Sequence, residues 1–313
     1  MSPKHVATIT LNVAYDLVGF CPEIELGEMN RVQTIGLHAA GKGINVAKVL
    51  KGLDVNVTVG GFLGQDNSEG FLQLFQELNL TNRFQLVEGQ NRLNIKLTEK
   101  EGAVTDLNFS GFKITPEDWQ QFSTESLSWL GAFDMVVVSG SLPVGVTPEA
   151  FRGWLEQLKK YCSHLILDSS EAAFVEGVKA LPWLVKPNLR ELETWIGHRL
   201  PTQEAVIEAA CSLQKQGIAH VIVSLGADGA LWVNDSGVWS AKPPKCKVVS
   251  TVGAGDSMVG GLVYGLLMEE SSEQTLRLAT AIAALAVSQS NVGITQSPEL
   301  TAMMARIDLK QLN

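Results

Sequence analysis

The sequence Gly253-Ala254-Gly255-Asp256 combines a flexible backbone with a carboxylate, directly before an apolar run from Met258 to Met268. The apolar run predicts a helix packed on a sheet, and the glycines allow close approach of a ligand to the backbone. Unpaired N–H groups at a helix start favour an anion. The Asp256 carboxylate would repel an anion that binds there, a cost that has a purpose if the carboxylate accepts a proton, as a general base does. The local sequence leaves a second interpretation open, in which Asp256 only caps the helix.

A second glycine turn, Gly41-Lys42-Gly43-Ile44-Asn45, also precedes residues at helical spacing. It predicts an anion-binding cradle in which Lys42 and Asn45 are candidate ligand contacts. Gly36 to Gly43 nearly matches a P-loop, but Gly43 stands where that motif places the Ser or Thr that ligates Mg²⁺. A P-loop is therefore disfavoured.

Two further polar positions have both a functional and a purely structural interpretation. Asp16 follows the predicted buried strand 6–13, where α/β sheets place ligand groups, although a turn-forming Asp fits equally well. Asn188 and Glu191 stand at the start of a predicted helix, 189–196, with the spacing of a helix cap and its acidic partner. On local grounds, the capping interpretation is favoured over a Mg²⁺ site.

The elements that must position these residues alternate between short buried strands and helices. Strands are predicted at 6–13, 55–61, 133–139, 164–168, 183–186 and 219–225, and helices at 44–50, 70–78, 148–160, 171–179, 189–196 and 202–216. This order predicts a doubly wound α/β layer structure with a mostly parallel sheet and right-handed crossovers. No linker or internal repeat interrupts it, so residues 1–313 are expected to form one domain.

Two segments depart from this alternation, around 13–37 and 88–111. Both contain stretches with one polar face, which predict exposed strands, and residues 99–102 suit a hairpin turn between two of them. We expect these segments to form a small appended sheet that covers the site.

Composition limits the classes of protein to be considered. The 313 residues are 45% hydrophobic and 18% charged, which suits a well-buried globular core. The net charge of −9 argues against nucleic acid or an anionic membrane as the main partner. The apolar run 278–287 is too short to span a bilayer, and the N-terminus lacks a signal pattern. Four cysteines without a CxxC pair suggest reduced thiols and a cytoplasmic protein.

Several separated motifs together resemble the PfkB (ribokinase-like) sugar kinases. They occur in the family's order along essentially the whole chain: Thr10-Leu11-Asn12 with Asp16, Gly41 to Ala47, Ser139 to Pro143, Lys186-Pro187-Asn188 with Glu191, Ser224 to Gly229, and Ser250 to Gly261. The sequence departs from the pattern at Val13, usually Pro, and at Ala40, usually Gly. A positive φ at Ala40 would cost about 1 kcal/mol. The resemblance implies a three-layer αβα fold with a small β-sheet lid.

The resemblance also implies roles for the residues that match its motifs. Asp256 would be the general base, and Gly253, Ala254 and Gly255 the anion hole for the transferring phosphoryl group. The implied contacts to the sugar hydroxyls are Asp16, Gly41, Gly43 and Asn45, with Asn94 and Ser139 as further contacts. Lys42 and Arg92 would bind the phosphate that the sugar already carries.

The implied cofactors are ATP and Mg²⁺, together with K⁺, which some relatives bind. The implied nucleotide site comprises Lys186, Asn188, Ser224, Gly226, Gly229, Ser250, Thr251 and Val252. Asn188 and Glu191 would order Mg²⁺ through water. The residues implied for K⁺ are Ser250, Val252, Asn291 and Gly293.

Within the family, the chain looks most like the kinases that convert D-fructose 1-phosphate to D-fructose 1,6-bisphosphate. The near alternatives are kinases of tagatose 6-phosphate or fructose 6-phosphate, and a more remote one is a sugar-phosphate-binding regulator without turnover. A dinucleotide oxidoreductase is disfavoured because no GxGxxG follows the first strand. By analogy with the family, we expect a homodimer formed through apolar residues of the lid.

Overall fold

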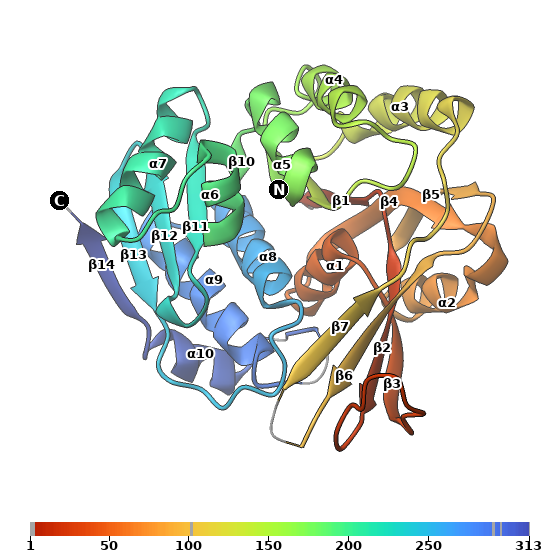
Figure 1. Ribbon diagram of the computed structural model, residues 1–313. Coiled ribbons are helices and arrows are strands. Elements are labelled where there is room, and N and C mark those ends of the chain that lie inside the picture. The colour runs from red at the N-terminus through yellow and green to blue at the C-terminus, as the bar shows by residue number, and fades with distance from the viewer. Residues whose placement is uncertain (1–3, 101–102, 290–291, 295, 313) are drawn as a thin grey trace.

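The computed structural model describes residues 4–100, 103–289, 292–294 and 296–312. A large sheet lies between two layers of helices, and a small second sheet stands apart at its side (Figure 1). This architecture confirms the predicted α/β class with a mostly parallel central sheet and a small β-sheet lid.

The large sheet has ten strands in the described part of the chain. Their order across the sheet is β14 (Asp308–Leu312), β13 (Gly237–Lys242), β12 (Ala230–Asn234), β11 (His220–Ser224), β10 (Leu184–Val185), β9 (Leu165–Ser169), β8 (Met135–Gly140), β1 (His5–Thr10), β4 (Asn56–Gly64) and β5 (Thr81–Val87). Strands β11 to β5 run parallel, whereas β12, β13 and β14 are antiparallel additions at one edge. The parallel part fits the alternation of strands and helices in the sequence.

The helices are α1 (Lys42–Gly52), α2 (Glu69–Glu77), α3 (Pro116–Leu130), α4 (Pro148–Leu158), α5 (Glu171–Gly177), α6 (Leu189–Ile196), α7 (Gln203–Lys215), α8 (Ala254–Leu267), α9 (Ser272–Ala286) and α10 (Pro298–Met304). Helix α1 packs on β1, β4, β8 and α8, and α8 packs in turn on α9. Helices α5, α6 and α7 contact β9 and β11. Because α1 and α8 touch, their N-terminal ends can contribute to one site.

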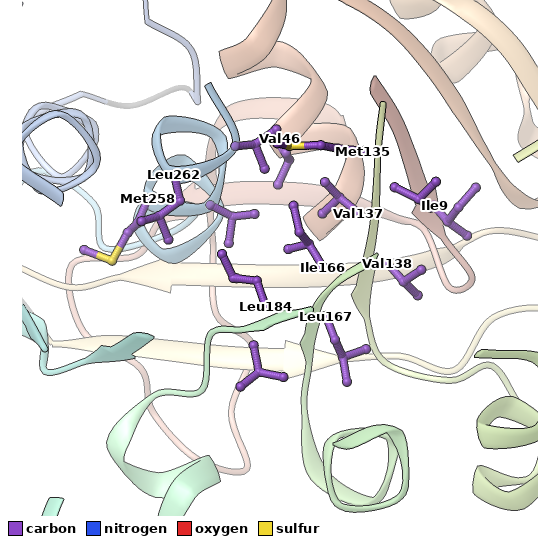
Figure 2. Close-up of a cluster of buried hydrophobic side chains, with 14 of the residues drawn as sticks. Ile9, Val46, Met135, Val137, Val138, Ile166, Leu167, Leu184, Met258 and Leu262 are labelled. Carbon is purple, nitrogen blue, oxygen red and sulfur yellow. The ribbon is translucent and has the colours of Figure 1, made fainter. Parts of the chain in front are cut away.

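The core below that site is continuous between strands and helices. Figure 2 shows Val46 of α1 and, farther off beside Met258, Leu262 of α8 on the same side of β8 as Val137, while Val138 points to the other side. The side chains of Val46, Leu262, Val137 and Val138 are buried, with at most 2% of their surface exposed. Alternate residues of β8 therefore pack toward the helices on opposite faces of the sheet, as expected for a strand buried on both faces.

The small sheet has the order β3 (Gln33–Ala40), β2 (Ala14–Phe20), β6 (Arg92–Thr98) and β7 (Val104–Asn108). Strands β2 and β6 are parallel, and β3 and β7 pair with them antiparallel. The sheet is open to solvent at its outer strands, where Leu37 and Leu107 are about half exposed. In the predicted turn 99–102, Glu99 N–H bonds to Ala103 O, and residues 101–102 lie outside the described residues.

Local details differ from the sequence-based expectations for physical reasons. Strand β1 ends at Thr10 rather than at Asn12, and the Asn12 side chain donates to Ser141 Oγ and Leu142 O. Gly36 lies within β3, so the near match to a P-loop spans a strand and a helix start and forms no phosphate loop. Ala40 ends β3 and is not among the non-glycine residues with positive φ, so the strain considered there does not arise. The antiparallel strand β14 was not predicted.

Among the described helices, none is both long and apolar enough to cross a membrane.

Candidate functional site

The carboxyl ends of β8, β9 and β10 bring three polar side chains to one edge of the large sheet. Ser139 and Asp168 are register partners near the ends of β8 and β9, and Lys186 directly follows β10. All three are almost completely buried. In α/β sheets this edge is where ligands bind.

Asp256 stands in the first turn of α8, whose N-cap is Gly253 in the left-handed region with φ 72°. The Asn45 side chain, from the first turn of α1, donates a hydrogen bond of 2.8 Å to Asp256 Oδ2. Burial, with a contribution from the negative charge of Asp168, raises the pKa of Asp256 to about 6, against the opposing attraction of Lys42. The carboxylate is thus oriented and able to take up a proton close to neutral pH.

The backbone around Asp256 forms an anion-binding surface. The first N–H groups of α8 have no acceptor within their own helix, and Gly253 to Gly255 leave them uncovered. Lys186 Nζ lies 3.5 Å from the point where a Cβ on Gly255 would stand. A cation and helix N–H groups therefore face the same space, which is the arrangement that stabilises a phosphoryl group.

Asp168 joins the two lysines of the site into one charged cluster. Its Oδ1 lies 3.2 Å from Lys186 Nζ and 3.5 Å from Lys42 Nζ. Burial disfavours the charged form of Asp168, but the attraction of Lys186 and Lys42 outweighs it and holds the pKa below its ordinary value. Burial likewise lowers the pKa of Lys42, yet Asp168, Asp256 and Glu191 together raise it above its usual range. Lys42 therefore remains charged at neutral pH.

Lys42 and Arg92, predicted to share one phosphate, lie in different surroundings. Lys42 Nζ pairs with Asp168 and lies 3.9 Å from Glu191 Oε1, on the side of β9 and α6. Arg92 begins β6 in the small sheet and is within electrostatic range of Asp16. The assignment of Lys42 and Arg92 to the phosphate of the sugar stays a prediction.

Asp16 and Asn94 are cross-strand partners on β2 and β6, and Asn94 Nδ2 donates a 3.0 Å bond to Asp16 Oδ1. Asp16 lines a cavity of about 980 Å³ with Asn45, Lys48, Val252 and further residues of the body. Polar groups from the lid sheet and from α1 thus face one space.

Several buried polar atoms of the predicted site residues and of Asp168 have no hydrogen-bond partner in the described part of the chain. They are Arg92 Nε, Asn94 Oδ1, Ser139 Oγ and both carboxylate oxygens of Asp168, whose contacts to the lysines are ion pairs. Buried polar groups are normally satisfied, so these atoms mark places where a polar ligand would bind.

Asn188 and Glu191 make both bonds of a capping box at the start of α6. Asn188 Oδ1 accepts from Glu191 N at 2.8 Å, and Glu191 Oε2 accepts from Asn188 N at 2.8 Å. The capping interpretation is thereby confirmed. Glu191 Oε1 is directed toward Lys42 and remains available to a ligand.

Carboxylate oxygens suit Mg²⁺, and the unsatisfied Asp168 together with Glu191 offers them at the phosphate-binding side. No group of three or more His, Cys, Asp or Glu among the described residues could hold a metal ion unaided. A Mg²⁺ ion held by Asp168 and Glu191 would therefore keep water molecules and phosphate oxygens as its other ligands.

The remaining predicted nucleotide residues lie at the end of β11 and before α8. Ser224 forms an isolated parallel β-bridge with Asn188. The turn after Ser224 contains Gly226 (φ 61°) and Gly229 (φ 88°). Thr251 lies exposed between Ser250 and Val252, which line the large cavity together with Gly293. Asn291 lies outside the described residues.

Two residues of the site were not predicted from the sequence. Asp168 ends a strand of the type Leu-Ile-Leu-Asp, the same strand-end signal that identified Asp16. Lys48 lies on the cavity side of α1 and donates to Ala39 O at 3.0 Å. Its position in an apolar helical run resembles that of any solvent-facing lysine, so the sequence carried no signal for it.

Comparison with known proteins agrees with this geometry. Residues 4–300 match the family described as pfkB family carbohydrate kinase. The chain is 70% identical over 310 residues to the 1-phosphofructokinase of Escherichia coli K12, covering 99% of each chain. It is 54% identical over 308 residues to that of Haemophilus influenzae, covering 98% of each. The crystal structure of phosphofructokinase-2 from Escherichia coli in complex with potassium has a TM-score of 0.88 and 26% identity, covering 96% of this chain and 98% of that one.

Proposed function

Because the chain belongs to the PfkB family of carbohydrate kinases, we propose that it is a 1-phosphofructokinase, which transfers a phosphoryl group from ATP to O6 of D-fructose 1-phosphate. The observation that carries the proposal is the 2.8 Å bond from Asn45 to Asp256 at the start of α8. This bond supports a role for Asp256 as an oriented proton acceptor at the helix start, in a chain that resembles 1-phosphofructokinases over its full length.

In the proposed reaction, the O6 hydroxyl of the sugar attacks the terminal phosphorus of ATP. The new O6–P bond forms as the bond from that phosphorus to the bridging oxygen breaks, so that ADP leaves. Asp256 takes the O6 proton, and Asn45 holds the carboxylate in the direction of the hydroxyl. Since the pKa of Asp256 is about 6, the base is ionised at neutral pH.

The transferring phosphoryl group carries negative charge that the surroundings of Asp256 can stabilise. The N–H groups led by Gly253, Ala254 and Gly255 supply fixed dipoles, and Lys186 and Lys42 supply positive charge. Mg²⁺, when bound near Asp168 and Glu191, would neutralise further phosphate charge.

The sugar phosphate would bind between the lid sheet and α1. Asp16, Asn94 and Asn45 offer donors and acceptors to its hydroxyls, together with the backbone of Gly41 and Gly43. Arg92, whose Nε has no partner among the described residues, would bind the 1-phosphate. Ser139 offers a hydroxyl at the edge of the large sheet.

The nucleotide would lie along Lys186, Asn188, the turn from Ser224 to Gly229, and the segment 250–252. For K⁺ we propose the carbonyls around Ser250, Val252 and Gly293, because these residues line one cavity and a related structure contains potassium.

The proposal also includes a cytoplasmic location, since the four cysteines are unpaired thiols, and a homodimer formed through the lid sheet.

Initial rates with ATP and three sugars test the assignment: D-fructose 1-phosphate, D-fructose 6-phosphate and D-tagatose 6-phosphate. We expect the highest kcat/KM with fructose 1-phosphate. A higher value with either 6-phosphate would refute the substrate, and tight sugar-phosphate binding without turnover of any of them would refute the kinase.

A further inference from the structure

The lid sheet is joined to the large sheet at a cluster of hydrogen bonds that the proposed chemistry does not use. Asn67 ends a short 3-10 helix, Gln65–Asn67, that directly follows β4. We call the hydrogen-bonded residues Tyr15, Gly64, Asn67 and Asn91 the Asn67 junction.

Asn91 is the buried centre of this junction, with 4% of its surface exposed. Its Oδ1 accepts from Gly64 N at 2.8 Å, and its Nδ2 donates to Gly64 O at 3.0 Å. Asn67 Oδ1 accepts from both the backbone N and the Nδ2 of Asn91, each at 2.8 Å. Every polar atom of the Asn91 side chain is therefore engaged at the end of β4.

The second lid strand is tied to the same residue through Tyr15. Tyr15 Oη donates to Asn67 O at 2.8 Å and accepts from Gly70 N at 3.1 Å. The ring packs on Phe71, with centroids 4.7 Å apart. One turn after β4 thus holds both β2 and β6.

Two glycines permit these contacts. A Cβ on Gly64 would stand 2.8 Å from Asn91 N, and one on Gly70 would stand 2.7 Å from Tyr15 Oη. The backbone of the body and the polar groups of the lid can approach so closely only because both side chains are absent.

The residues held by the junction directly precede the proposed sugar contacts. Tyr15 precedes Asp16 on β2, and Asn91 precedes Arg92 on β6. Asp256, in contrast, belongs to α8 of the body. The junction is therefore placed to set where Asp16 and Arg92 stand relative to Asp256.

We propose that Asn67, Asn91 and Tyr15 are positioning residues that fix the lid strands, with Asp16 and Arg92, over the base Asp256. This inference rests on the proposed function, in which Asp16 and Arg92 hold the sugar phosphate. The nucleotide contacts proposed above all lie in the body, so the junction acts on one substrate and leaves the other unaffected.

Steady-state kinetics of Asn67→Ala and Tyr15→Phe test the proposal, with each substrate varied in turn. Loss of the Asn67 side chain should raise the KM for fructose 1-phosphate about tenfold, and Tyr15→Phe about threefold, because small displacements of binding groups are costly. The KM for ATP should stay within about twofold. Asn67→Asp keeps the acceptor for both Asn91 bonds but loses the 3.3 Å donor bond to Asn91 O, so its KM for fructose 1-phosphate should lie between those of wild type and Asn67→Ala.

Asn82→Ala is the matched control, because Asn82 is an exposed asparagine of β5 whose side chain caps a local backbone N–H. It should change neither KM. A general loss of stability would raise both constants or lower only the active fraction, so an equal rise in the KM for ATP overturns the proposal. An unchanged KM for the sugar in both Asn67→Ala and Tyr15→Phe overturns it as well.

If Asn67→Ala does not fold, the two KM values of Tyr15→Phe alone test the proposal, because the new phenylalanine ring still packs on Phe71. If the wild-type enzyme prefers another sugar phosphate, the proposed substrate fails, while the same comparison with the preferred sugar still tests the junction.

Discussion

Asp256 is buried where an ionised carboxylate is unfavourable, and its environment only partly compensates. Its pKa is raised from 3.8 to about 6, so the unfolded chain releases this proton more readily than the folded one. The ionised residue therefore lowers stability above about pH 6, whereas the penalty is absent below about pH 4, where both states are protonated. A group kept under such a cost is typical of an active site.

Replacement Asp256→Asn should separate activity from stability. We expect kcat to fall by a factor of about 10²–10⁴, because no proton acceptor remains. At pH 8 the free energy of unfolding should rise by about 1–3 kcal/mol relative to wild type, and this gain should vanish near pH 4. Stopped-time assays and urea unfolding at the two pH values measure both effects.

Asp235→Asn serves as the control, since Asp235 lies on an exposed turn between β12 and β13. Asp235→Asn should neither lower kcat nor raise the free energy of unfolding at pH 8 relative to pH 4. Near-normal turnover by Asp256→Asn would eliminate the proposed base.

The sequence predicted Asp256 and Asn45 because each follows a glycine turn at a helix start, a signal that is local. The position of Asp168 and the ion pairs of Lys42 depend on three strands that end at one edge of the sheet. The register between strands that are distant in the sequence cannot be predicted from local residue spacing. Hence the sequence predicted Lys42 at a helix start, but not its ion pairs with Asp168 and Glu191.

At the scale of elements, the start of α8 depends on a glycine that no other residue can replace without strain. Gly253 has φ 72°, and a Cβ there would stand 2.2 Å from Val292 Cγ2. Both the backbone conformation and the neighbouring side chain therefore require its absence.

Gly253→Ala should lower the free energy of unfolding by about 1–3 kcal/mol and reduce kcat by at least about tenfold, because the displaced N–H groups no longer face the phosphoryl group. Gly153→Ala in α4 is the matched control, since a Cβ there meets no atom of the described residues within 4 Å, apart from its own helix backbone and chain neighbours. That variant should gain about 0.5–1 kcal/mol and keep its activity. Thermal unfolding with parallel rate assays compares the two, and equal behaviour would contradict the requirement at Gly253.

At the scale of the whole molecule, the lid sheet leaves apolar side chains in solvent. Ile35 and Leu37 of β3 and Val104 and Leu107 of β7 are each 46–59% exposed. Leu37 and Leu107 lie in one row across the sheet, through Leu17 and Ile95, so this apolar row suits contact with a second copy of the chain.

Sedimentation velocity at micromolar concentration should therefore give a dimer. The double variant Leu37→Glu with Leu107→Glu should shift it to monomer, because burying two carboxylates at the contact is unfavourable. Tyr161→Glu, at an exposed aromatic residue between α4 and β9, should leave the dimer intact. A wild-type monomer at this concentration would exclude the proposed contact.

The layered architecture was predictable because continuous apolar strands and amphipathic helices alternate along most of the chain. The antiparallel edge was harder, since β14 is short and half exposed and carries no buried pattern. The lid was predicted from its alternating polarity, whereas the junction that anchors it depends on asparagines that read as ordinary turn residues.

Strand order also has a consequence for how the chain folds during synthesis. β1 leaves the ribosome before its two neighbours, β4 and β8, yet it lies inside the sheet, where Val6 pairs with Val57 on one side and with Met135 on the other. The edge of β1 that pairs with β8 stays unpaired until the chain has grown past β8. Until then an apolar strand lacks one of its two neighbours. Completion of the sheet centre must therefore wait for most of the first half of the chain, and fragments that end before β8 would expose a strand edge prone to association.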